Sequence, residues 1–487
     1  MRSAGGLGAV IAALALVEVT SGIIQGYYTP ILSDIARHLS IHDADVNWFE
    51  AAQLMVSGLS VPILAKMGDL WGHKYILLVA TAITAAASFA VALAPTFATF
   101  LVAWALQGVY TVWLPLEVAI IYLAARRARR PDAPGETRRA AGLLVFALEA
   151  GVIAGALAGG ALVEIIGAFE LMLARPAFAV TACRDAIRRF VPQTPPSASG
   201  RLDWAGIGWL TASLVSLTAG LTLLRTVGPT SPLPWASFLV AIALLVPFVR
   251  HELRAAEPLV DVRVVARPTM WPVQLTAGLF GVSVLGAQAP LSTFARTDAA
   301  DVGYGLSLDA GAVSIIIGAY VVSLAAGALA LPSLSRLLSP RWALVVAACF
   351  VAVGYLLFLP WHATLTQTLT NMVIAGLGSG LLVAALPAAA AAAAPEGRTG
   401  MATGLTNSVK TIGGSIASAV FGVALFSGVS QAGIAAGETA APLTGYLTVW
   451  TMCGVTAAVC AVLLAGFVPK AAFTAAPPAA DLAKAGA

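Results

Sequence analysis

The sequence has 487 residues, of which 59% are hydrophobic and only 10% are charged, and its mean hydropathy is +0.89. Soluble proteins carry about 25% charged residues, so this composition excludes a water-soluble globular enzyme. The net charge of +4 does not indicate nucleic-acid binding, because the basic residues lie in short segments between apolar runs rather than on one face.

Apolar runs long enough to cross a bilayer follow one another along nearly the whole chain. A span needs about 20 apolar residues, and the runs are too long for barrel strands. We therefore expect an all-α integral membrane protein, because helices satisfy their own backbone hydrogen bonds in lipid. A hydropathy window predicts about fourteen helices, at residues 7–31, 46–65, 75–94, 97–125, 140–163, 165–182, 204–224, 233–249, 270–291, 310–334, 342–360, 369–394, 400–427 and 444–468. Glu170, Arg175 and Pro176 interrupt the sixth of them.

The basic residues orient these runs, because cytoplasmic loops carry an excess of Lys and Arg. With the N-terminus inside, only Arg37, Arg175, Arg225 and Arg296 of the 27 Lys and Arg residues fall on the opposite side. The first run has no convincing cleavage site, so it is interpreted as a retained span. We expect a multi-pass protein of the bacterial inner (plasma) membrane with both termini cytoplasmic.

Several motifs in chain order resemble those of one transporter family. Residues 65–74, AKMGDLWGHK, resemble the signature loop of the major facilitator superfamily, G-x-L-A-D-R-x-G-R-K. Residues 106–108 resemble the end of its R-x-x-Q-G motif, and residues 151–160 resemble its antiporter motif, G-x-x-x-G-P-x-x-G-G. Residues 201–204, 250–261 and 400–414 are similar to the fourteen-span drug:proton antiporter branch. The chain is identified as a divergent member of that branch.

The resemblance implies a division into two pseudo-symmetric six-helix bundles, at residues 1–190 and 266–470, with substrate bound between them near mid-membrane. Residues 191–265 would form two inserted transmembrane helices with cytoplasmic linkers, and residues 471–487 a disordered cytoplasmic tail. It also implies a conformational gate formed by Asp69, Gly72, His73 and Lys74. Closely spaced glycines allow helices to approach each other, which predicts a helix-packing motif at Gly151, Gly155, Gly159 and Gly160.

Three substitutions depart from the family pattern and bear on proton coupling. Trp104 stands in place of the arginine in span four, Ala156 in place of the proline in the antiporter motif, and Ser21 in place of an aspartate in span one. The usual proton-coupling pattern is thus incomplete, and other groups would have to supply it.

Three glutamates, Glu18, Glu117 and Glu149, are predicted about 13–17 Å from the cytoplasmic side, near the middle of the bilayer. A carboxylate in lipid is costly and usually faces a cavity or partner, so these residues are candidates for proton or cation coupling. The alternative is a protonated carboxyl group that only bridges neighbouring helices. Lys410 is the base predicted deepest in the core, and it either pairs with a carboxylate across the bundles or extends toward the cytoplasm. Both interpretations stay open.

Aromatic and amide side chains in the first half predict a substrate cavity, since apolar or cationic ligands bind against such walls. Trp and Tyr near helix ends also favour the membrane interface, and Glu50 could be a solvated acid there. The candidate cavity residues are Gln25, Glu50, Gln53, Trp104, Gln107, Tyr110 and Trp113.

The predicted function is that of a transporter working by alternating access, exporting small hydrophobic or amphipathic molecules and driven by protons, as in multidrug efflux. One alternative is a lipid or lipid-like metabolite transporter without proton coupling, and another is a non-transporting sensor or scaffold. We expect membrane lipids as surroundings, no nucleic-acid partner and a monomer. No enzymatic activity, cofactor or metal is predicted, because no catalytic or metal-ligand constellation stands out in the sequence.

Overall fold

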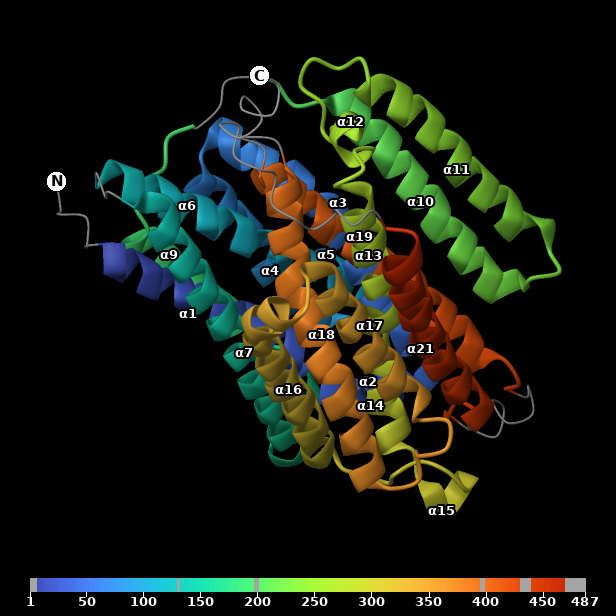
Figure 1. Cartoon of the computed structure of the whole chain (residues 1–487). Coiled ribbons are helices and arrows are strands. Elements are labelled where there is room, and N and C mark those ends of the chain that lie inside the picture. Colours follow the sequence, from blue (N-terminus) through green and yellow to red (C-terminus); the bar gives the residue numbers. More distant parts are fainter. Residues whose placement is uncertain (1–6, 129–131, 197–200, 395–398, 430–438, 469–487) are drawn as a thin grey trace.

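The computed structural model describes residues 7–128, 132–196, 201–394, 399–429 and 439–468, and their regular secondary structure is helical (Figure 1). The predicted C-terminal tail, 471–487, lies outside these residues. The α-helices of the first half are α1 (Leu7–Tyr27), α2 (Leu32–His38), α3 (Val46–Trp71), α4 (His73–Leu93), α5 (Phe97–Gln107), α6 (Trp113–Arg127), α7 (Ala133–Ile165), α8 (Phe169–Leu173) and α9 (Arg175–Phe190). Next come α10 (Trp204–Val227), α11 (Pro232–Glu252) and α12 (Val262–Val265). The rest are α13 (Trp271–Val284), α14 (Gln288–Arg296), α15 (Ala299–Val302), α16 (Ala310–Leu337), α17 (Pro340–Leu356), α18 (Leu365–Ala393), α19 (Thr399–Phe426) and α21 (Leu443–Gly466).

The predicted number of fourteen membrane helices is not supported. Among the described residues, 12 helical segments are long and apolar enough to cross a membrane. The sixth predicted span is broken into the short α8 and into α9, which carries Arg184, Arg188 and Arg189 in its second half. The eleventh predicted span contains α17, which is apolar but has only 17 residues. Charge in the one case and length in the other thus lower the count.

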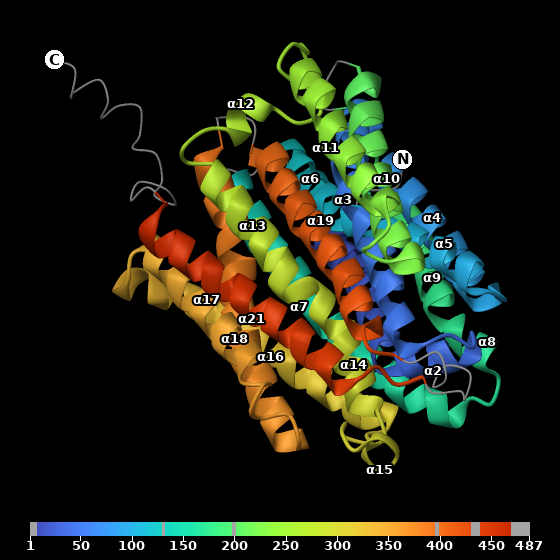
Figure 2. The same cartoon turned by 90° about the vertical axis from the view of Figure 1, so that its right-hand side faces the viewer.

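The helices form two groups that lie side by side (Figures 1 and 2). In the first group, α1 to α9, helix α1 packs along α7, and α4 packs against α5 and α9. In the second group, α13 to α21, helix α16 packs against α18, and α17 packs against both α18 and α21. The groups meet where α3 contacts α19, α7 contacts α16 and α2 contacts α14.

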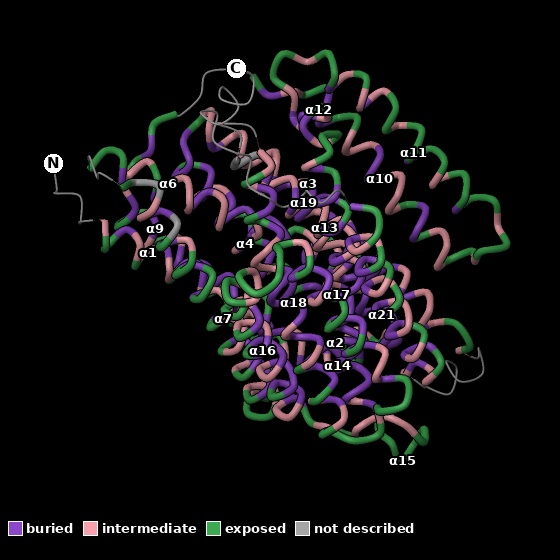
Figure 3. Tube along the Cα trace, in the orientation of Figure 1, coloured by how far each residue is buried: buried purple, intermediate pink, exposed green. Residues whose placement is uncertain are grey.

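Helices α10 and α11 pack mainly on each other and form a hairpin at the edge of the molecule (Figure 1). Only 22% of the most apolar stretch of α10 and 17% of that of α11 is buried, against 67% for the segment Trp271–Arg296. Buried residues lie inside both groups and where the groups meet (Figure 3). The apolar outer surface of the hairpin therefore suits a lipid environment.

Short 3-10 turns bend several of the long helical segments. These turns are η1 (Thr29–Ile31) between α1 and α2, η3 (Gly108–Val112) between α5 and α6, and η4 (Leu285–Ala287) between α13 and α14. A further turn, η2 (Asp43–Asp45), precedes α3. Two opposite ends result, which we call the Asp34 end, where α2, α14 and the start of α3 lie, and the Asp69 end, where α3 finishes.

The glycines of α7 bring it into backbone contact with α1. A Cβ atom added at Gly151, Gly155 or Gly159 would lie 2.3, 2.7 or 1.9 Å from a backbone carbonyl oxygen of α1. Gly160 faces the other group instead, where its Cβ would lie 2.6 Å from the carbonyl oxygen of Ala310. One stripe of small residues therefore builds the first group and also joins it to the second.

Candidate functional site between the two helix groups

A small recess of about 60 Å³ lies where the two groups meet in the Asp34 half of the molecule. The first group contributes most of its lining, and the second group contributes the start of α14. Glu50 is the ionisable side chain in this lining, is partly exposed there, and accepts a hydrogen bond from the backbone N–H of Ala289. The lining residues are Gln25, Thr29, Leu32, Val46, Glu50, Gln53, Trp104, Gln288 and Ala289.

Trp104 forms the aromatic side of the recess. Its ring centroid lies 4.9 Å from that of Tyr28, 5.6 Å from that of Phe100 and 5.7 Å from that of Phe49. Its indole Nε1–H has no hydrogen-bonding partner among the described residues. The place of the family's arginine is thus taken by a large apolar surface with one unused donor.

The structure brings together four of the seven predicted cavity residues, Gln25, Glu50, Gln53 and Trp104. The other three lie in the interior of the first group. Gln107 donates from Nε2 to Ser88 Oγ at 2.9 Å, and Trp113 is fully buried next to Tyr110, with ring centroids 6.3 Å apart. A sequence pattern does not separate these sets, because Trp104 and Gln107 lie on the same helix α5 and only the packing of its neighbours shows that Gln107 is directed at Ser88.

Glu18 of α1 and Glu117 of α6 are neighbours inside the first group, with exposed fractions of 1% and 0%. Both carboxylate oxygens of Glu117 and one of Glu18 lack a hydrogen-bonding partner in the described part of the chain. Cys183 of α9 and Thr20 lie close by. Two buried acids therefore lie together among α1, α6 and α9.

Glu149 lies apart from that pair and belongs to the contact between the groups. It is near enough to Lys410 of α19 for the two side chains to influence each other electrostatically across the contact between the groups. Lys410 also lines a small recess inside the second group with Phe280 and Asn407. The three glutamates predicted at one depth thus divide into two sites.

The loop between α3 and α4 makes its contacts within the first group. His73 Nε2 lies 3.2 Å from Asp69 Oδ1, and Gly72 has a φ of 98°, which favours glycine. The Nζ atom of Lys74 donates to the carbonyls of Arg188 and Val191, at 3.1 and 2.5 Å. Lys74 therefore caps the C-terminal end of α9, where a cation is favourable.

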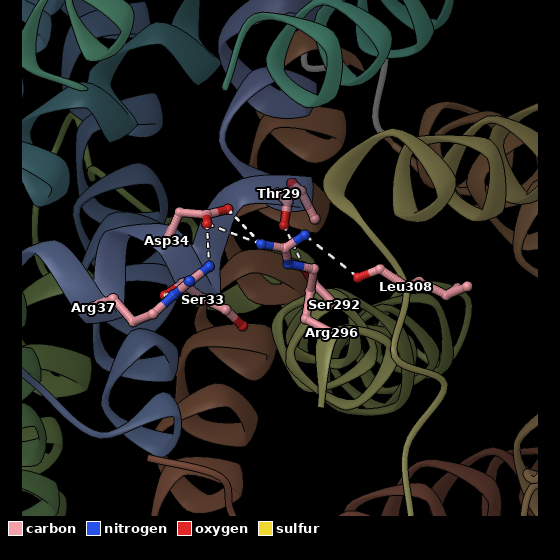
Figure 4. Close-up of polar contacts among 7 residues, drawn as sticks. All are labelled: Thr29, Ser33, Asp34, Arg37, Ser292, Arg296 and Leu308. Carbon is pink, nitrogen blue, oxygen red and sulfur yellow. Dashed lines mark hydrogen bonds and ion pairs between the residues drawn. The ribbon is translucent and has the colours of Figure 1, made fainter. Parts of the chain in front are cut away.

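An ion-pair cluster that the sequence analysis did not single out joins the two groups at the Asp34 end (Figure 4). The Nη2 atom of Arg296 on α14 lies 2.9 and 3.1 Å from the two carboxylate oxygens of Asp34 on α2. Arg37 also pairs with Asp34, and Ser292 donates to the carbonyl of Thr29 at 2.5 Å. The side chains of Asp34 and Arg296 are only 14% and 15% exposed, so solvent screens this contact little.

Further hydrogen bonds join the groups in the same half of the molecule. Ser415 donates to the carbonyl of Ala51 at 2.6 Å, and Ser418 donates to that of Asn47 at 2.9 Å, which fastens α19 to α3. Ser314 of α16 donates to the carbonyl of Ala156 of α7 at 2.7 Å. These contacts hold the two groups together beside the recess.

One sequence signal points to this cluster. Arg37, Arg225 and Arg296 are exceptions to the predicted cytoplasmic placement of basic residues, and each pairs with an aspartate, Asp34 or Asp45. Basic residues are disfavoured on the non-cytoplasmic side, so an arginine there is expected to have a stabilising acidic partner. Pairing each exception with the acids predicted on the same side would have found the clusters.

The family model described as "Major Facilitator Superfamily" matches residues 14–418. The chain belongs to the major facilitator superfamily. Members of this superfamily are membrane transporters, and the many apolar helices of this chain agree with a multi-pass membrane protein. The fourteen-span drug:proton branch is a finer assignment than this match supports.

The similar curated proteins are transporters and resistance proteins. The chain is 24% identical to an uncharacterized MFS-type transporter, YvkA, from Bacillus subtilis, over 85% of this chain and 90% of that protein. It is 26% identical to the puromycin resistance protein pur8 of Streptomyces alboniger, over 88% and 82%. It is 25% identical to the tetracenomycin C resistance and export protein of Streptomyces glaucescens, over 87% and 76%.

Solved structures with the same fold include an auto-inhibited POT family peptide transporter, with a TM-score of 0.67 and 14% identity. The alignment covers 94% of this chain and 96% of that one. The nucleoside transporter NupG has a TM-score of 0.63 and 13% identity, over 94% and 99%. These likenesses show the fold alone.

Proposed function

We propose that this protein exports small hydrophobic or amphipathic molecules by alternating access, with the recess around Glu50 and Trp104 as part of the substrate path. The observation that carries the proposal is the position of the recess, which is lined by both groups and lies beside the Asp34–Arg296 contact. The names of the resistance and export proteins similar to this chain support the direction of transport and the kind of substrate.

In this proposal the two groups are the moving bundles, with boundaries near residues 190 and 266. The Asp34 end faces outward, the Asp69 end faces the cytoplasm of a bacterial cell, and the present arrangement is closed to the outside. Both termini are then cytoplasmic, in agreement with the distribution of basic residues. The protein acts as a monomer surrounded by membrane lipids.

Protons enter the cycle through the Glu18–Glu117 pair. Two adjacent carboxylates in an apolar interior cannot both be ionised without a large electrostatic cost. The pair therefore binds at least one proton while its surroundings stay dry, and opening α1 against α6 and α9 to water would release it. Glu149 is the second candidate, because its charge is balanced by Lys410 only while the groups are arranged as they are here.

Proteoliposomes with an imposed pH gradient test this coupling. We expect uptake of a fluorescent amphipathic cation such as ethidium, and dissipation of the gradient when the probe is added. Replacing Glu18 or Glu117 by Gln should abolish gradient-driven transport and leave downhill exchange. The control is Glu164→Gln, on the exposed end of α7. If gradient-driven transport survives in each of the Glu18, Glu117 and Glu149 variants, the assignment of proton coupling to these glutamates is wrong.

A second candidate function is the transport of a lipid-like molecule without proton coupling. It is favoured by Trp104, which replaces a charged residue of the family and lines the recess together with Leu32 and Val46. Analysis of lipid extracted from the purified protein would identify such a substrate. The bound lipid should be lost in Trp104→Ala and retained in the control Trp209→Ala, on the exposed side of α10.

A further inference from the structure

The inserted hairpin, α10 and α11, contacts both groups of helices, and its contacts with each group differ in kind. It lies against α3 of the first group and α19 of the second (Figure 2). Helices α3 and α19 form one of the contacts between the groups, so the hairpin covers the boundary along which the groups would separate. The strength of its contacts with each group determines with which group it moves.

At the Asp34 end the hairpin is fastened to the first group by charge. The guanidinium group of Arg225, near the end of α10, forms an ion pair with Asp45. The same group lies 5.9 Å from the ring centroid of Trp48 and 5.3 Å from that of Phe97. The Asp45 side chain is only 8% exposed. Since Asp45, Trp48 and Phe97 all belong to the first group, this contact can persist when the groups move apart.

At the Asp69 end a second fastening also leads to α3. The Nζ atom of Lys66 lies 3.5 Å from Glu257 Oε2, and the backbone N–H of Arg201 donates to the same oxygen at 3.3 Å. An apolar cluster surrounds this point, formed by Leu202, Ile207 and Leu259 with Ile63, Met67 and Leu70 of α3. The hairpin and its linkers are thus attached to the first group near both ends of α3.

The base of the hairpin is itself braced. Asp203 caps the start of α10 through the backbone N–H of Gly206 at 2.9 Å, and its Oδ1 atom lies 2.7 Å from His251 Nε2. The backbone N–H of Val260 donates to Glu252 Oε2 at 3.0 Å. Both helices and the linker after them therefore form one unit that can move as a body.

The contacts of the hairpin with the second group have a different character. The shared cluster brings leucines of α10 and a phenylalanine of α11 against short aliphatic side chains of α19. Aliphatic surfaces of this kind slide without breaking directional bonds. The residues are Leu217, Leu221 and Phe238 on the hairpin, and Ala419, Val420 and Val423 on α19.

We propose that the hairpin is a permanent part of the first group, which it accompanies through the transport cycle while its inner face slides over α19. It rests on the proposed movement of the two groups. Its role is to cover the line between α3 and α19 in the Asp34 half, so that membrane lipid does not enter the recess when this end opens.

The distances among three spin labels test the proposal in the full-length protein in lipid nanodiscs, after the four native cysteines are replaced. The label sites, all exposed, are Leu93→Cys in the first group, Val227→Cys on the hairpin and Ser427→Cys in the second group. Pairs are compared in the parent protein and in the Arg296→Ala variant, which we expect to favour opening of the Asp34 end because it removes the ion pair with Asp34. We expect the Leu93–Ser427 and Val227–Ser427 distances to change together and the Leu93–Val227 distance to stay constant.

A Leu93–Val227 distance that changes as much as Leu93–Ser427, with Val227–Ser427 constant, overturns the proposal, because the hairpin would then follow the second group. Arg225→Gln should broaden the Leu93–Val227 distribution, whereas Arg225→Lys should keep it narrow, and an unchanged Gln variant counts against the fastening. The measurement needs no substrate. Failure of the export proposal would appear in transport assays and leave these distances unaffected.

Discussion

The two ends of the molecule use their polar side chains in opposite ways. At the Asp34 end, the Asp34–Arg296 pair and the Ser292–Thr29 hydrogen bond join the first group to the second. At the Asp69 end, the His73–Asp69 and Lys74–Val191 contacts stay inside the first group. If the two groups move apart as proposed, polar contacts between them are temporary, whereas contacts within one group are permanent. The difference supports the proposal that the Asp34 end is the closed one.

The largest expected effect is a loss of stability when the packing of α7 on α1 within the first group is disrupted. In Gly159→Val, the new Cβ would lie 1.9 Å from the backbone oxygen of Tyr27, which cannot move away without displacing α1. We expect a loss of about 3 kcal/mol or more of stability and little monodisperse protein in size-exclusion chromatography. The control is Gly142→Val on the same helix, where no atom lies within 4 Å. Equal yields of the two variants would contradict the packing described for α7.

The neighbouring Gly160→Val should spare the first group and prevent closure of the Asp34 end. Its Cβ would lie 2.3 Å from Ser314 Oγ and 2.6 Å from the oxygen of Ala310, both in the second group. We expect normal yield and a Gln25→Cys reporter in the recess that reacts faster with an impermeant thiol reagent. A reporter that stays as slow as in the parent protein would show that α7 and α16 do not control closure.

Breaking the Asp34–Arg296 pair should favour the open form by about 3 kcal/mol, because one buried charge loses its partner. Arg296→Ala and Asp34→Ala should each speed modification of the Gln25→Cys reporter about 100-fold. The charge reversal, Asp34→Arg with Arg296→Asp, should recover part of the closure. Arg37→Ala is the control, since this partner of Asp34 is 61% exposed and should contribute less than about 1 kcal/mol. Additive single effects in this cycle would rule out a direct coupling.

At the opposite end, Lys74→Met should lower stability by about 1–2 kcal/mol without changing closure, because its ammonium group binds carbonyls at the end of α9. Thermal unfolding of the purified protein measures the loss. Lys66→Met serves as the comparison, since its ion pair with Glu257 is partly exposed and should contribute less. Faster modification of the Gln25→Cys reporter in Lys74→Met would mean that the two ends are coupled more tightly than their contacts indicate.

The smallest expected effect is a pH dependence at the Asp34 end. Burial lowers the pKa of His42, although Asp45 and the Ala440 carbonyl act in the opposite direction, and the ring packs edge-on against Phe426 of the second group. Because the closed form prefers neutral His42, closure is complete above the ordinary histidine pKa of about 6.5 and weakens as the pH falls below it.

Modification of the reporter should accordingly speed up a few-fold on acidification. His42→Gln should remove this dependence and the exposed His38→Gln should keep it. If the modification rate still depends on pH in the His42→Gln variant, the dependence arises from another titratable group.

The helical class, the family and the close packing of α7 on α1 could be predicted from the sequence because apolar length and glycine spacing are local properties. The residues around the recess could be predicted only in part. Gln25 and Trp104 line it, whereas Gln107 donates a hydrogen bond to Ser88 inside the first group, because the packing of neighbouring helices decides which side chains line the recess. The Asp34–Arg296 contact joins residues 262 positions apart, and no local pattern reports such a distance.

With the Asp34 end facing outward, as proposed, the pairing of its arginines with aspartates also bears on how the chain is inserted during synthesis. Translocating a positive charge is disfavoured, and Arg37 follows Asp34 on the same short helix, so the two cross as a unit without net charge. Arg225 and Arg296 must instead cross before they meet Asp45 and Asp34, which by then have already been translocated. The acids made first would thus draw the later helices into their final orientation, and assembly of this end would follow the order of translation.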